Sequence, residues 1–158
     1  MDRGRWPSGL EHSCPMRAQW PETPAGSPEL ERLVLAPTAA SVRRARDFTH
    51  KRLADWGLEE LLDDTVIVMS ELLSNALTHA LTRTSTTPAL QLVLIRHPRS
   101  LVVVVTDPAS APPLPVVQPD EFATSGRGLH IVDTLSSRWG WVPLSTRGKA
   151  VWAVLDEM

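Results

Sequence analysis

Apolar residues recur along the chain with two periods, and these periods predict its helices and strands. Over residues 59–81 they return every three to four positions, which is typical of a helix with one buried side. An earlier helix is predicted from Thr38, as its cap, to Trp56, with Gly57 placed to end it. Short apolar runs bounded by turn residues predict strands over residues 31–35, 89–96, 101–106, 138–142 and 149–155.

The order of these elements predicts the fold class. A last helix is expected from Leu129 to about Ser136, which makes the order β-α-α-β-β-loop-α-β-β. Strands adjacent in sequence are joined by hairpin-length turns, so an α/β fold is expected: an α+β two-layer sandwich with a mixed, mostly antiparallel sheet and helices on one face. The run Leu101–Val105 is apolar without alternation, as expected of a strand covered on both faces.

Two segments carry no such pattern. Residues 1–28 are rich in Pro, Gly, Ser and charge, which predicts a flexible N-terminal arm before one domain over residues 29–158. Within the arm, Trp6 and Trp20 are candidates for docking on the domain or on a partner. Residues 108–125 hold five prolines, and a loop of this length inside a domain is often a lid or a binding loop.

Composition excludes several classes of function. The net charge of -2 provides no strong field for attracting DNA or anionic lipid, so nucleic acid is not expected as a direct partner. The single cysteine, Cys14, excludes an intrachain disulfide and a cysteine-rich metal cluster, and it fits a reducing interior. No apolar run reaches the roughly 18 residues of a membrane span, and the N-terminus lacks the apolar core of a signal peptide. A cytoplasmic protein without a membrane segment is therefore expected.

Candidate chemistry first appears on the helix over residues 66–80. Glu71, Asn75 and His79 are spaced four residues apart, and we expect them on a stripe opposite the apolar side. That apolar side comprises Val66, Met69, Leu72, Leu73, Ala76, Leu77 and Ala80. An ordinary solvated stripe is one interpretation, but Asn and His are poor helix formers, and a stripe selected for solubility would use Lys, Glu or Arg. The other interpretation is a binding site with a base, a neutral oxygen ligand for a hard cation, and a further donor or acceptor.

Two more features follow in the chain. Asp107 comes directly after an apolar strand, where its carboxylate could accept a hydrogen bond from a ligand amino group, or simply form a turn before proline. Gly126-Arg127-Gly128-Leu129 stands at a junction between loop and helix. Such a junction is either a flexible helix start or an anion site, because glycines admit a ligand to backbone N–H groups and a helix N-terminus carries partial positive charge.

In this order, the features resemble the GHKL superfamily, and within it the stand-alone anti-sigma-factor serine kinases of bacteria. Residues 71–80 resemble the N box, 107–110 the G1 box, 126–132 the G2 box, and 148–152 the closing strand. The resemblance spans about Leu30 to Leu155. It implies a Bergerat-type fold that binds ATP and Mg²⁺ between helices and sheet, with the proline-rich segment as a lid.

The resemblance also implies roles for individual residues. Asn75 would coordinate Mg²⁺, His79 would support the same pocket, and Glu71 would be the general base that takes a proton from a serine hydroxyl. Asp107 would bind the adenine amino group. Further contacts to the nucleotide would come from Ala109, Gly126, Arg127, Gly128 and Leu129. The chain departs from the family pattern at Ala109 and Ala111, where many relatives carry glycine, and at Ala150, where relatives commonly carry a hydroxyl.

These features lead to a principal hypothesis and two alternatives. The principal hypothesis is an ATP-dependent regulatory serine/threonine protein kinase and anti-sigma factor that binds a sigma factor and phosphorylates an anti-anti-sigma protein of STAS type. As in its relatives, a homodimer is expected. The alternative is a non-catalytic, ATP-responsive module that sequesters a transcription regulator, and the presence of Glu71 argues for the kinase. A detached fragment acting with a histidine-containing protein is less favoured, because the chain has no dimerising helices or phosphoacceptor domain.

Overall fold

The computed structural model describes residues 29–81, 89–107, 127–144 and 148–158, and only the backbone of residues 79–81 and 127–128. The predicted arm (1–28) and the predicted proline-rich loop (108–125) lie outside the described residues. The order of the described elements matches the predicted order. They are β1 (Glu29–Leu35), α1 (Ala40–Trp56), the 3-10 turn η1 (Glu59–Leu61), α2 (Leu62–Leu81), β2 (Leu90–His97), β3 (Ser100–Asp107), α3 (Arg127–Leu135), β4 (Arg138–Pro143) and β5 (Lys149–Asp156). No helix in these ranges is both long enough and apolar enough to span a bilayer.

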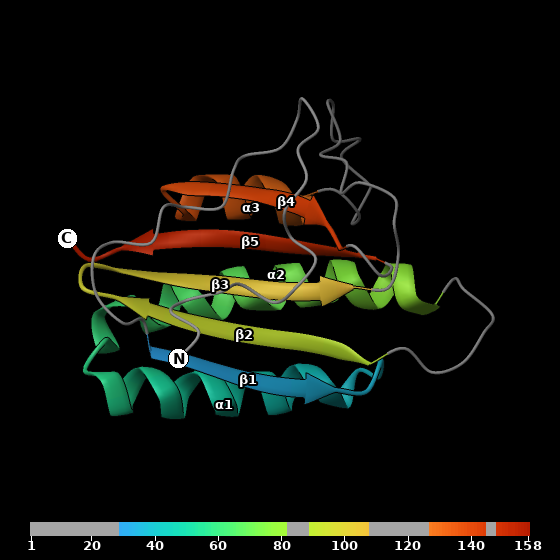
Figure 1. Ribbon diagram of the computed structural model, residues 1–158, viewed down its shortest axis with the longest axis horizontal. Coiled ribbons are helices and arrows are strands. Elements are labelled where there is room, and N and C mark those ends of the chain that lie inside the picture. Colours follow the sequence, from blue (N-terminus) through green and yellow to red (C-terminus); the bar gives the residue numbers. More distant parts are fainter. Residues whose placement is uncertain (1–28, 82–88, 108–126, 145–147) are drawn as a thin grey trace.

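The five strands form one sheet in the order β1-β2-β3-β5-β4. Every neighbouring pair among them is antiparallel. The three helices pack on one face of this sheet (Figure 1). The expected two-layer α+β sandwich is therefore confirmed, and its mostly antiparallel sheet is antiparallel throughout the described strands.

Strand β3 lies at the centre of the sheet, and both of its faces are buried. Leu101, Val103 and Val105 belong to the core on the helix side. Val102 and Val104 belong to a second apolar cluster on the opposite face. All five side chains are at most 4% exposed. The prediction of a strand covered on both faces is confirmed, and the alternation shows which residues of each strand face the helices.

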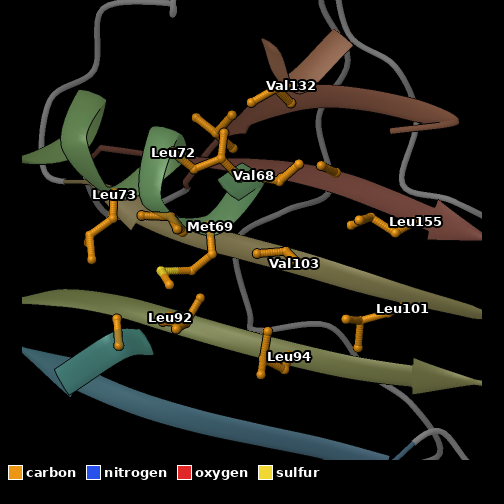
Figure 2. Close-up of a cluster of buried hydrophobic side chains, with 14 of the residues drawn as sticks. Val68, Met69, Leu72, Leu73, Leu92, Leu94, Leu101, Val103, Val132 and Leu155 are labelled. Atoms are coloured by element: carbon orange, nitrogen blue, oxygen red, sulfur yellow. The ribbon is translucent and has the colours of Figure 1, made fainter. Parts of the chain in front are cut away.

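Helix α2 links the layers of the domain. Figure 2 shows Met69 pointing from α2 toward Leu92 and Val103 of the sheet, while Leu72 lies toward Val132 of α3. Helix α1 packs along α2 as well. Burial of each such side chain contributes about 1.5–3 kcal/mol. The position of α2 is therefore set from three sides, and so is the position of any functional group it carries.

Helix α1 ends as predicted but begins differently. Gly57 follows it with a φ of 68°, a left-handed conformation that glycine adopts at little cost. The prediction that the Thr38 side chain caps the helix is wrong: the capping position is Ala39, which makes no capping hydrogen bond with a side chain, and the Thr38 hydroxyl lies 3.4 Å from that of Ser41. Thr38 contributes its carbonyl instead, which accepts a hydrogen bond from the N–H of Ser41 at 3.0 Å.

Candidate functional site

Glu71 and Asn75 lie one turn apart on α2, and both are half-buried. The prediction that they lie opposite the apolar side is wrong. They follow Val68 by three and seven positions, which is helical spacing, and Val68 is 0% exposed. Glu71 and Asn75 therefore lie at the edge of the buried face of α2. Leu72, which follows Glu71 in the helix, lies toward Val132 of α3 (Figure 2).

The buried arc of α2 is turned relative to the predicted one, which explains the error. Val66 was assigned to the apolar side and is only half-buried. Thr65, which was not assigned to it, is 0% exposed, like Val68. Two helices and the sheet surround α2, so its buried arc is wider than the stripe that one partner would require.

The side chains of Glu71 and Asn75 are available for chemistry. No other side chain in the described ranges forms a hydrogen bond or an ion pair with either of them. A carboxylate that can accept a proton thus lies beside a carboxamide whose oxygen can bind a hard cation. His79 follows Asn75 by one turn in the backbone of α2, and its side chain lies outside what the structure describes.

Asp107 is the last residue of β3, and its carboxylate forms a buried ion pair. The Nζ of Lys149 donates to its Oδ2 at 2.8 Å, and the side chains of Lys149 and Asp107 are 1% and 2% exposed. The two residues are direct partners in the antiparallel register of β3 and β5. Strand alternation places both on the face toward α2, because Val105 and Val151, two residues away in each strand, belong to the core on the helix side.

Lys149 is the residue of this site that sequence reasoning missed. Ala150 was considered as the family's hydroxyl position on the closing strand, but its side chain lies in the cluster on the opposite face with Val142 and Trp152. An Ala in that cluster cannot contact a ligand on the helix side of the sheet. Alternation puts Lys149 on the same face of β5 as Val151, but both faces of this strand are apolar, so the sequence does not show which face meets the helices.

Helix α3 brings a helix N-terminus to the same layer. It begins at Arg127, and Leu129 in its first turn is 2% exposed in the helix-side core. The backbone N–H groups of a first turn have no intrahelical partner, and they carry partial positive charge that suits a phosphate. For Arg127 and Gly128 the structure describes the backbone alone, and Gly126 and Ala109 lie outside the described residues.

Helix α2, which carries Glu71 and Asn75, contacts β3, β5 and α3, the elements that carry the other groups. Its C-terminal half extends along the end of the sheet where β3 ends and β5 begins (Figure 1), the end that carries the ion pair of Asp107 and Lys149. Glu71 and Asn75 lie on the same helix and are half-buried. Amide and carboxylate oxygens are ligands that Mg²⁺ prefers, a helix N-terminus suits phosphate, and a buried carboxylate suits an amino group. The chemistry of the residues present therefore fits ATP with Mg²⁺.

The pKa of His97 is shifted, but this residue lies away from the site. His97 ends β2 at the hairpin to β3, at the opposite end of β3 from Asp107. Burial lowers the pKa of its imidazole below the ordinary value, because desolvation disfavours the charged form. Its Nε2 is buried and makes no hydrogen bond. His97 therefore lies outside the candidate site.

Comparison with known proteins identifies a family for most of the chain. The sequence profile of the histidine kinase-like ATPase domain matches residues 35–155. That range includes Glu71, Asn75, Asp107 and Lys149, together with the start of α3. A search of curated proteins returns no match to the chain.

Proposed function

Because the chain belongs to the family of histidine kinase-like ATPase domains, we propose that it is an ATP-dependent serine kinase and anti-sigma factor. Its acceptor would be an anti-anti-sigma protein of STAS type, and its binding partner a sigma factor. Domains of the GHKL superfamily bind ATP, generally with Mg²⁺. ATP binding is therefore the general part of this proposal. The specific part, transfer to a serine, is supported by the position of Glu71.

Glu71 is the observation that carries the proposal. Its carboxylate is half-buried one turn before Asn75, and no described side chain binds it, so it can take a proton from a hydroxyl group. A module that only binds partners would have no need of a half-buried carboxylate at this position of α2. When bound, ATP with Mg²⁺ supplies the phosphoryl group and the positive charge that stabilises its transfer.

The other site residues would bind and orient the nucleotide. Asn75 would offer its amide oxygen to Mg²⁺, with His79 beside it, and Asp107 would accept a hydrogen bond from the adenine amino group. The backbone at the start of α3 would hold the phosphates, with contributions from Ala109, Gly126, Arg127, Gly128 and Leu129. In this arrangement each group acts by position and charge, which supplies much of the catalysis in phosphoryl transfer.

The test is transfer of the γ-phosphate to a co-purified acceptor. Glu71→Ala should lower the rate of transfer by about 10²–10⁴-fold, the usual contribution of a positioned base, and leave ATP affinity nearly unchanged. Glu60→Ala, which alters an exposed carboxylate on η1, is the matched control and should transfer like the wild type. Transfer at the wild-type rate by Glu71→Ala would refute the base assignment. Tight ATP and partner binding without any transfer by the wild type would favour the non-catalytic module.

A further inference from the structure

The buried ion pair at the end of β3 and β5 is unusual for its surroundings. The other described residues on the helix-facing side of these two strands are apolar: Leu101, Val103, Val105, Val151, Ala153 and Leu155. Aliphatic side chains in place of the pair would stabilise the core about equally well or better, because two charges lose their hydration on burial. Packing alone therefore does not explain Lys149 and Asp107.

We infer that Lys149 is a base-recognition residue, which donates a hydrogen bond to N1 of adenine while Asp107 accepts one from the 6-amino group. The inference rests on the proposed nucleotide site, and it extends that site by a residue and a contact. Its basis is the juxtaposition of a donor and an acceptor: Nζ and Oδ2 lie 2.8 Å apart on neighbouring strands, on the face toward α2.

The chemistry of the two groups is complementary to one purine. An ammonium group only donates hydrogen bonds, and a carboxylate only accepts them. Adenine presents a donor, its amino group, next to an acceptor, N1. Guanine presents the reverse order, the acceptor O6 next to the donor N1–H. In the pose that suits adenine, guanine would place its O6 against the carboxylate of Asp107 and its N1–H against the ammonium group of Lys149. Neither hydrogen bond could then form.

Lys149 and Asp107 together should therefore discriminate between ATP and GTP more strongly than Asp107 alone. Asp107 and Lys149 are register partners in a continuous antiparallel ladder, so their order cannot easily reverse to suit guanine. Each buried charged group that lacks its partner weakens binding, and the loss of one hydrogen bond to a charged group corresponds to about 10- to 100-fold in affinity. A site that hydrogen-bonds its substrate at two points rejects an analogue without those groups more strongly than a site shaped by apolar contacts.

The test removes the N1 acceptor from the ligand and the donor from the protein. Binding of ATP, 1-deaza-ATP and GTP is measured by calorimetry with Mg²⁺ present; 1-deaza-ATP keeps the amino group and replaces N1 with C–H. The wild type should bind 1-deaza-ATP about 10- to 100-fold more weakly than ATP. Lys149→Met should bind both equally, and its preference for ATP over GTP should fall by a similar factor. A residue with only a structural role would not abolish the difference between the two ligands.

Controls separate recognition from folding. Lys51→Met removes the chain's other lysine, which is exposed on α1, and it should keep the wild-type difference between ATP and 1-deaza-ATP. If Lys149→Met does not fold, as judged by circular dichroism, Lys149→Arg replaces it. Its guanidinium keeps the charge beside Asp107 but moves the donor atoms, so the ratio of the two affinities should shrink.

The outcomes distinguish this inference from the function it rests on. Equal wild-type affinity for ATP and 1-deaza-ATP would overturn the role of Lys149 and leave ATP binding and phosphoryl transfer intact. An unchanged ratio in Lys149→Met, or in Lys149→Arg where that variant is used, would overturn it as well. A wild-type protein that binds no adenine nucleotide would overturn both the inference and the proposed function.

Discussion

Removing Lys149 should destabilise the domain more than removing any exposed charge. In Lys149→Met the carboxylate of Asp107, 2% exposed, loses a cation that donates to it at 2.8 Å. Breaking a buried ion pair from one side typically lowers the free energy of unfolding by about 3–5 kcal/mol, because a charge stays buried without compensation. The whole stability of a domain is about 5–15 kcal/mol, so the variant should show a large decrease in denaturation midpoint.

The comparison that tests this reasoning is a double-mutant cycle. Asp107→Asn combined with Lys149→Met removes both charges. The double variant should therefore have a free energy of unfolding about 2 kcal/mol or more above that of Lys149→Met alone. Lys51→Met is the control, and it shows how much free energy of unfolding is lost when an exposed ion pair is broken. Lys51 and Asp55 lie 3.5 Å apart with side chains 67% and 47% exposed, and such a pair contributes only about 0–1 kcal/mol.

The assay is equilibrium unfolding in urea, followed by tryptophan fluorescence and circular dichroism, with the free energy of unfolding extrapolated to water. Two results would refute the reasoning. One is a Lys149→Met variant within about 1 kcal/mol of the wild type, as expected for an exposed pair. The other is a double variant whose loss equals the sum of the two single losses, since independent sites add and coupled sites do not.

Three further predictions concern the metal, the helix end and pH. Asn75→Ala should weaken ATP binding in the presence of Mg²⁺ much more than in its absence, and equal affinity of the wild type with and without Mg²⁺ would contradict this role. Gly57→Ala should lower the free energy of unfolding by about 1–2 kcal/mol, because φ is 68° there and an added Cβ meets no atom within 4 Å, so the cost is that of the backbone alone. Burial lowers the pKa of His97 in the folded state, so as the pH falls the unfolded state becomes protonated at a higher pH than the folded state. The stability from its neutral form should be complete above the unfolded pKa of about 6.5 and decrease as pH falls below it. Unfolding curves of His97→Leu should lack that part of the decrease, and an identical pH dependence in both proteins would exclude His97 as its source.

Local patterns were sufficient for the elements and the family. The period of apolar residues placed three helices and five strands in the order observed, because a periodic stripe must face a core whatever that core contains. The uninterrupted apolar run of β3 identified the central strand. The motifs at residues 71–80, 107–110, 126–132 and 148–152 resemble the GHKL superfamily, and the match to the histidine kinase-like ATPase domain over residues 35–155 confirmed that family.

Long-range packing decided the rest. The sequence by itself could not show that Glu71 and Asn75 are half-buried, because the width of the buried arc of α2 depends on how many neighbours surround it. It also could not pair Lys149 with Asp107, which lies 42 residues away. That contact requires the register of two strands that are not consecutive in the chain, and register is set by the whole sheet. A shift of one residue would exchange Lys149 for Ala150 on the helix side, so the tertiary structure alone determined which of them faces the site.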